Sequence, residues 1–141
     1  MDALLTINPM LEAVTDHLGT LLPAAAVAFH QQSPAMARLP FCVVAQAPST
    51  VEALTLSRRP DLLILRFRVF SMHESEPQAS ALADVVRDAL VGTVGGGGWA
   101  WPIPLTGAIV LHRSCDLDGT PVTIQGIAQV NEGYELQVQR T

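Results

Sequence analysis

Residues Leu62 to Leu90 constrain the fold of this chain more than any other stretch, because their hydrophobic period changes once and sharply. Up to Phe70 the residues alternate, so that one side holds Leu65, Phe67 and Val69 and the other holds Ile64, Arg66, Arg68 and Phe70. Such alternation predicts a strand with one buried face. Farther on, apolar residues recur every three or four positions, at Ala79, Leu82, Ala83, Val86 and Leu90. That period predicts a helix, which can cover the sheet to which the strand belongs.

Both ends of this helix carry recognisable signals. Ser75 and Gln78 have the spacing of a capping box, and Pro77 suits the first helical turn. Gly92 suits the C′ position just beyond the last turn. We therefore expect a helix from about Glu76 to Val91.

A second helix is expected near the start of the chain. Asn8-Pro9 is a good start signal, with Asn as the N-cap and Pro at the first helical position. Pro23 should end this helix. Between them lies an apolar stripe formed by Leu11, Val14, Leu18, Leu21 and Leu22.

The remaining segments indicate strands and turns. Strands are expected at 41–45, 108–113, 120–130 (with a bulge at Gly126) and 134–140, while 24–29 fits a strand or a loop and 51–56 is ambiguous. Asp118-Gly119 indicates a hairpin turn, and Asn131-Glu132-Gly133 a second turn. The sum predicts an α+β fold: one mainly antiparallel sheet on which an N-terminal helix and a central helix pack. At 141 residues we expect a single domain spanning 1–141.

Composition excludes some classes of function. The net charge is −5 and there is no lysine, which disfavours gripping nucleic acid through its phosphates. Two cysteines are too few for a disulfide framework, so reduced thiols are expected. Acidic residues interrupt the apolar N-terminal run and no stretch is long enough for a membrane span. We expect a soluble protein made in the cytoplasm.

Motifs of catalysis and cofactor binding are missing. The four histidines lack metal-ligand spacing, and neither an HExxH nor a GxSxG sequence occurs. Gly95–Gly98 lacks the Lys and Ser/Thr of a phosphate-binding loop. We therefore expect no catalytic residues, no metal and no cofactor, and a binding or structural role instead of an enzyme.

Two groups of residues are candidates for contacts with a partner or with other copies. The first comprises arginines: Arg58 and Arg59 in a turn before the central strand, and Arg66 and Arg68 on its polar side. An exposed sheet face or ion pairs between strands is the simpler explanation of the last two. The second is the glycine run, with Gly97, followed by Trp99 and Trp101. These tryptophans are either interface anchors or dock on their own domain.

The order of segments resembles a known family, the small tail-terminator (tail-completion) proteins of long-tailed phages and phage-derived particles such as gene transfer agents. The resemblance begins with the helix at 11–22, the segment Ala26–Phe29 and the loop marked by Pro34. It continues with the strand sequence Leu39-Pro40-Phe41-Cys42-Val43-Val44 and the helix from Ala79 to Leu90. It ends with the strand near Val110–Arg113, the Asp-Gly turn and the closing strand. The glycine-tryptophan loop departs from the family's shorter linker, and 51–56 matches weakly.

The resemblance implies a ring, hexameric in this family, that caps the tail tube, stops its polymerisation and presents the surface where the head docks. Its partners would be further copies of the chain, the tail-tube protein and a head-completion or neck protein, with DNA only passing through the channel. Its place would be the head-proximal end of the tail in the virion. Two alternatives stay open. One is a related neck or head-completion protein, and the other is a small α+β ligand-binding domain or enzyme subunit with the Gly95–Trp101 loop as a lid.

Overall fold

The computed structural model describes residues 3–23, 26–31, 38–47, 51–52, 62–95, 97–117 and 119–140, with the backbone alone at 3–8, 51–52, 62, 116–117 and 140. The helices are α1 (Ala3–Leu21) and α3 (Glu76–Val91). The strands are β1 (Val27–His30), β2 (Phe41–Gln46), β3 (Val51–Glu52), β4 (Leu62–His73), β5 (Ala108–Leu117), β6 (Val122–Ile124) and β7 (Ile127–Arg140).

The described strands form one mixed sheet in the order β1-β2-β4-β7-β5, with β3 also paired to β4 and β6 to β7. β1 runs parallel to β2, and the other pairings are antiparallel. The two long strands β4 and β7 form the centre and pair along their whole described length, from Leu62↔Gln139 to His73↔Ala128. The predicted α+β class, with a mainly antiparallel sheet and two helices, is confirmed.

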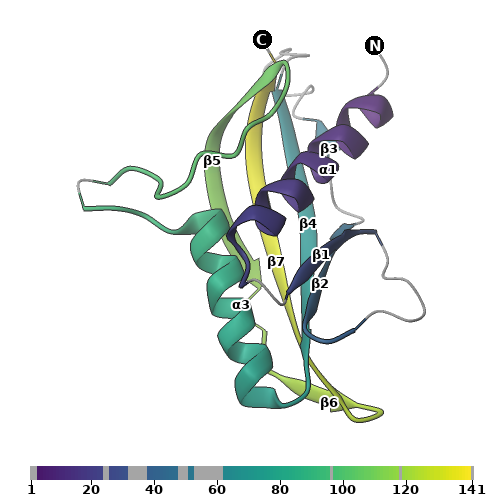
Figure 1. Cartoon of the computed structure of the whole chain (residues 1–141). Helices are drawn as coiled ribbons and strands as arrows, with labels where there is room; N and C mark the ends of the chain where they lie inside the picture. Colours follow the sequence, from purple (N-terminus) through teal and green to yellow (C-terminus); the bar gives the residue numbers. More distant parts are fainter. Residues whose placement is uncertain are drawn as a thin grey trace.

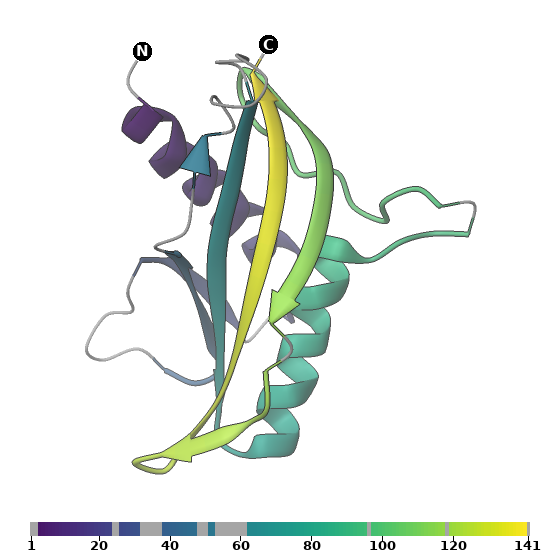
Figure 2. The same cartoon turned by 180° about the vertical axis from the view of Figure 1, so that it is seen from behind.

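Both helices lie on the same face of the sheet, α1 over the side with β1 and β2 and α3 over β4, β7 and β5 (Figures 1 and 2). The molecule therefore has two layers. We call the other face of the sheet, which no described helix covers, the open face. On β4 it carries the side chains of Ile64, Arg66, Arg68, Phe70 and Met72, which alternate with the buried ones.

The core fills the space between the sheet and the helices. β4 contributes Leu63, Leu65, Phe67 and Val69, each at most 1% exposed, as the alternation predicts. The Phe67 ring stacks on that of Tyr134 in β7, with centroids 5.7 Å apart. The predicted apolar faces are also confirmed: the residues of the α3 stripe are all buried, as are four of the five in the N-terminal stripe, of which Leu22 lies just after α1.

α3 has the bounds that the sequence predicts. The Ser75 hydroxyl accepts a hydrogen bond from the Gln78 backbone N–H at 3.4 Å, as a capping box requires. Gly92 ends the helix, but its φ of −61° and ψ of 143° are extended and not the left-handed conformation of a C′ glycine. Space explains the glycine instead, because a Cβ there would lie 2.3 Å from the Asp88 carbonyl oxygen.

The predicted start of α1 at Asn8-Pro9 is wrong. The helix begins at Ala3 and Pro9 lies inside it. A proline within a helix removes one backbone hydrogen bond and crowds the carbonyl four residues earlier. Here Ala3, Leu4 and Leu5, all strong helix formers, extend the helix past that local defect.

The predicted turn at Asn131-Glu132-Gly133 is also wrong, because these residues lie in the middle of β7 and pair with Phe70, Val69 and Arg68. The turn before β7 is Gln125-Gly126, whose φ values of 50° and 79° are left-handed. Gly126 is thus a turn residue and not a bulge. Long-range pairing with β4 has overridden the local turn signal.

The predicted Asp118-Gly119 hairpin finds no counterpart, although Asp118 itself lies outside the described residues. β5 and β6 do not pair with each other. Both pair with the edge of β7 opposite β4, where Leu117 faces Gly133 and Val122 faces Gln129. Gly119 permits this course, since a Cβ there would lie 2.3 Å from the Asn131 carbonyl oxygen. The ambiguous segment 51–56 begins with the short strand β3, and its remainder lies outside the described residues.

Candidate assembly surfaces

A short hairpin leaves the C-terminal end of α3 and projects from the body of the molecule (Figure 1). Thr93 bridges Trp99, and backbone N–H groups of Val94 and Ala100 donate to the Gly98 and Gly92 carbonyls at 2.9 and 2.8 Å. Gly97 has a φ of 89°, which favours glycine. We call residues 93–101 the tryptophan hairpin. Its described part is a hydrogen-bonded turn and not the free linker that four glycines predict.

Arg113 holds the base of this hairpin. The side chain is buried, and its Nη1 donates to the carbonyl oxygens of Leu90 at 3.1 Å and Trp101 at 2.7 Å. The guanidinium carbon also lies 5.1 Å from the centre of the Trp99 ring, a cation–π distance. Arg113 therefore joins the end of α3 to both tryptophan-bearing positions.

The sequence does not predict that Arg113 points inward. Simple alternation from Ala108, which faces the helices, would turn Arg113 to the open face. A bulge between Val110 and His112 shifts the register by one residue, so Arg113 comes opposite buried Leu136. One extra residue, Leu111, thus turns Arg113 from the open face to the core.

His17 of α1 supplies a second nitrogen at the same helix end. Its Nε2 lies 3.1 Å from the Ala89 carbonyl oxygen, next to the Leu90 carbonyl that Arg113 binds. Donors are favourable here because the last carbonyls of a helix lack intrahelical partners. Burial lowers the pKa of His17 despite the bond to Ala89, and the Arg113 charge lowers it further. Burial also lowers the pKa of Arg113.

The two tryptophans differ in environment. Trp99 is half-buried and meets the His112 ring edge-on, with centroids 6.1 Å apart, in addition to Arg113. It docks on its own domain. Trp101 is 41% exposed, and its Nε1 donates weakly to Asp88 at 3.4 Å. Val94, farther out on the hairpin, is 53% exposed, so the hairpin offers two apolar side chains to solvent.

The arginines of the central strand lie elsewhere. Arg66 forms an ion pair with Glu135, its neighbour on β7, with Nε and Oε2 3.1 Å apart. Arg68 is exposed and stands between Ala45 and Gly133, two residues too small to cover it. Both are on the open face, across the sheet from the helix layer and the hairpin. Arg58 and Arg59 lie outside the described residues. Among the predicted site residues that the structure describes, Arg66 and Arg68 thus lie apart from Gly97, Trp99 and Trp101 of the hairpin.

Sequence reasoning missed an apolar tip at the other end of α3. Val122, Ile124 and Ile127 are 47%, 56% and 37% exposed, and all three face the open side of the β6–β7 hairpin. Thr123 points to the helix side, where its hydroxyl donates to Glu76 at 2.7 Å. The sequence shows that apolar and polar residues alternate here. Which of them face outward becomes clear only when the turn is known to lie at Gln125-Gly126.

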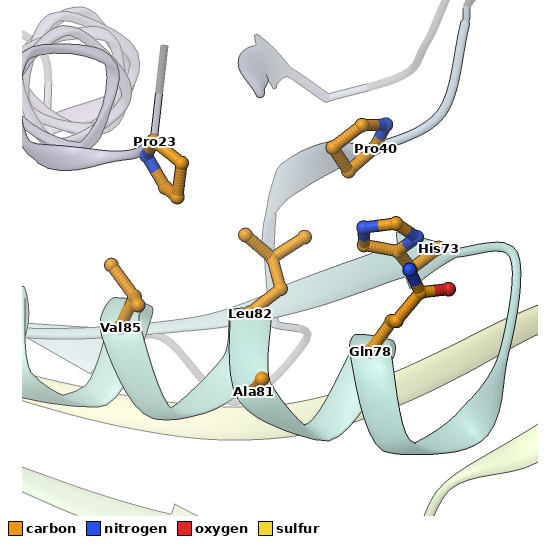
Figure 3. A pocket seen from close by; sticks show the side chains of 7 residues that line it. All are labelled: Pro23, Pro40, His73, Gln78, Ala81, Leu82 and Val85. Carbon is orange, nitrogen blue, oxygen red and sulfur yellow. The ribbon is translucent and has the colours of Figure 1, made fainter. Parts of the chain in front are cut away.

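An apolar groove of about 400 Å³ lies beside α3 (Figure 3). Its lining comes from the second residue after α1, from the residue before β2, from the end of β4 and from α3. These residues are Pro23, Pro40, His73, Gln78, Ala81, Leu82 and Val85. The sequence gives no warning of this groove, since its walls are distant in the chain.

Besides the apolar core, an ion pair between partly exposed Arg87 of α3 and buried Glu132 of β7 joins the helix layer to the sheet. Glu132, 1% exposed, accepts a hydrogen bond from the Arg87 Nη2 of α3 and lies 3.4 Å from the Tyr134 hydroxyl. Burial, with the Glu132 charge, raises the pKa of Tyr134. Burial also raises the pKa of the Cys42 thiol to about 11, which leaves it a poor nucleophile. These groups hold the layers together.

The described residues contain no group of three or more His, Cys, Asp or Glu that could hold a metal ion. Among the helices in the described part of the chain, none is long and apolar enough to cross a membrane.

Comparisons with known proteins bear on the fold. No family model matches the chain, and no curated protein matches it. A solved structure described as "Virion of native gene transfer agent (GTA) particle" contains a chain that resembles this one with a TM-score of 0.60 and 16% sequence identity. The likeness covers 92% of this chain and 93% of that one. The two chains share a fold over nearly their whole lengths.

Proposed function

We propose that this chain is a structural protein of a phage or phage-derived particle, and within it the tail terminator that caps the tail tube. The observation that carries the proposal is the likeness to a chain of a gene transfer agent virion, which extends over 92% and 93% of the two chains. A match confined to a common strand–helix unit would support nothing of this kind, because such units occur in many unrelated folds. Here the match leaves out less than a tenth of either chain, so it spans much more than one such unit.

The surfaces suit a subunit of a closed ring. Apolar side chains are exposed at several places in the described part of the chain, among them the tryptophan hairpin and the β6–β7 tip, which lie at opposite ends of α3. A ring subunit needs different patches for the next copy and for the tube, since a heterologous contact joins two unlike surfaces.

Mixing the protein with tail-tube protein tests the proposal. We expect light scattering to report a discrete oligomer, and electron microscopy to show a ring on one end of each tube whose growth has stopped. Tube protein without this chain is the control and should keep elongating. A protein that remains monomeric at all concentrations and never binds tube ends would contradict the proposal.

A neck or head-completion protein is the second candidate, because the same likeness to a virion chain supports it equally. It differs in its partner. A neck protein would bind isolated heads and leave free tube ends growing, whereas a terminator would bind tubes in the absence of heads. The two binding assays, run in parallel, separate the candidates.

The lid hypothesis for the glycine-tryptophan loop has less support from the geometry. Trp99 is held against Arg113, and the apolar groove takes none of its lining residues from 93–101. A lid would require a small molecule to change the tryptophan fluorescence of the free protein. We expect no change across a broad panel of ligands.

A further inference from the structure

The tryptophan hairpin is an uncharged projection on an acidic molecule. Residues 93–101 include no Asp, Glu, Lys or Arg, and within their described part the exposed large apolar side chains are Val94 and Trp101. The exposed side chains of the helix layer are otherwise rich in carboxylates: Glu12, Asp16, Glu74, Glu76, Asp84 and Asp88. The hairpin is thus one place where a second acidic copy can approach without bringing like charges together.

The apolar groove is an uncharged hollow on the same layer. Five of its seven lining residues are apolar, and Leu82 forms its floor between Pro23 and Pro40 (Figure 3). His73 and Gln78 stand at one end and can exchange hydrogen bonds with a guest. Like the hairpin, the groove has no carboxylate among its lining residues.

A single copy cannot fill its own groove with its own hairpin. The hairpin leaves the C-terminal end of α3, while the groove lies beside the part of α3 from Gln78 to Val85. α3 has 16 residues and is therefore about 24 Å long. The hairpin points away from the side of α3 that faces α1 and β2, where the groove opens (Figure 1). Projection and hollow are on opposite sides of one helix, so a contact between them joins different copies.

We infer that the tryptophan hairpin of one copy seats in the groove beside α3 of the next copy, with Val94 entering the hollow. The inference rests on the proposed ring and assigns its subunit contact. Such a contact is heterologous, because it joins two unlike surfaces and leaves the groove of one copy and the hairpin of the other free for further copies. It closes into a ring when the rotation between copies permits.

The size of the contact sets how it behaves. A fully buried tryptophan removes about 150–250 Å² from solvent, whereas a stable interface buries about 800 Å² on each partner. Val94 and Trp101 together supply a minor share of that area. Assembly should therefore depend on concentration and on ring closure, and a single disruptive substitution in the hairpin should be enough to shift it.

Cross-linking between two differently tagged variants tests the contact directly. One carries Val94→Cys and the other Ala81→Cys, a substitution at an exposed position of α3 beside the groove. Under mild oxidation the mixture should give a heterodimer joining the two tags, and each variant alone should give only the background expected from half-buried Cys115. Cys42 is buried and its high pKa keeps it out of the reaction.

Charge substitutions supply the second measurement. Val94→Asp and Ala81→Glu each put a carboxylate into the contact, and each should raise the concentration needed for assembly at least tenfold. Ile109→Asp is the matched control: it makes the same kind of change at a similarly exposed side chain, 51% against 53% for Val94, on β5 and away from both the hairpin and the groove. It should leave assembly of the ring unchanged. Thermal melts identify any variant that fails to fold.

The outcomes separate this inference from the proposed function. Rings that form on tube ends with both charge variants, and without the heterodimer, would overturn the hairpin contact and leave the tail-terminator proposal standing. A wild-type chain that neither assembles nor cross-links, even with tube ends present, would overturn both. A heterodimer together with weakened assembly of both charge variants supports the contact.

Discussion

At the scale of single residues, Arg113 and His17 decide how the C-terminal end of α3 is finished. Both side chains are buried and both reach backbone carbonyl oxygens of its last turn. Arg113 in addition binds the Trp101 carbonyl and faces the Trp99 ring. A buried cation is costly unless it is hydrogen-bonded, and Nη1 of Arg113 makes two such bonds, which tie the end of α3 to the hairpin.

Replacing Arg113 by Met should destabilise the protein by roughly 1–3 kcal/mol, because the buried Leu90 carbonyl and the partly buried Trp101 carbonyl lose their donor. The freed tryptophan hairpin should also give a red-shifted fluorescence. Arg68→Met is the matched control: Arg68 is exposed on the open face, where the same change should stay within about 0.5 kcal/mol. Urea unfolding followed by circular dichroism measures both. Equal losses in the two variants would show that Arg113 has no special structural role.

His17 should make stability depend on pH. Its pKa is lowered in the folded protein from the ordinary value of 6.5, so the unfolded chain binds the proton more tightly. The contribution of neutral His17 to the free energy of unfolding is therefore fully present above pH 6.5. It is lost as the pH falls through the lower pKa that His17 has in the folded protein. The slope reaches at most about 1.4 kcal/mol per pH unit. His17→Gln keeps a donor for Ala89 but does not titrate. The difference between wild type and variant should change between pH 7.5 and 5, and parallel curves would rule the effect out.

At the scale of elements, the sequence predicts well where one local period persists. The strand Leu62–Phe70 and the helix Glu76–Val91 were placed to within three residues, because alternation, capping and helical spacing agree. The sequence predicts two strands in place of β7. The reason is that Asn131 and Gly133 are residue types common in turns and that a glutamate such as Glu132 is rarely buried. Its partner Arg87 comes from α3, 45 residues away, and no local pattern reveals it.

The candidate surfaces were harder to predict than the elements. Trp99 and Trp101 were found because a glycine run followed by tryptophans is conspicuous, but their different roles depend on Arg113. That residue faces the core only because β5 has a bulge. The groove needs Pro23, Pro40 and α3 side by side, an arrangement set by tertiary packing. Arg66 proved to be an ion-pair member on the open face, one of the two explanations left open.

Gly92, at the C-terminal end of α3, allows a prediction about how this helix ends. Gly92→Ala should cost about 1–3 kcal/mol, because the new Cβ would lie 2.3 Å from the Asp88 carbonyl oxygen and the backbone must shift. Gly95→Ala, at a position with nothing within 4 Å, should cost far less. Thermal melts of the pair give the comparison. Similar melting temperatures would mean that the helix end tolerates a side chain.

At the scale of the whole molecule, two layers leave one sheet face uncovered and place apolar hairpins at both ends of α3 (Figures 1 and 2). Among the buried groups of the described part, Cys42 bonds to Ser71, and Glu132 bonds to Arg87 and Tyr134. These contacts serve packing. What is left for function is surface. An acidic chain with uncharged apolar projections suits assembly with defined neighbours better than adhesion to nucleic acid.

Electron microscopy of tail tubes grown with and without this protein tests the central claim most directly. We expect tubes in the mixture to stop growing and to carry one ring of this chain at a single end, while tubes alone continue to elongate. Tubes of unchanged length with bare ends, beside a protein that stays monomeric, would contradict the account.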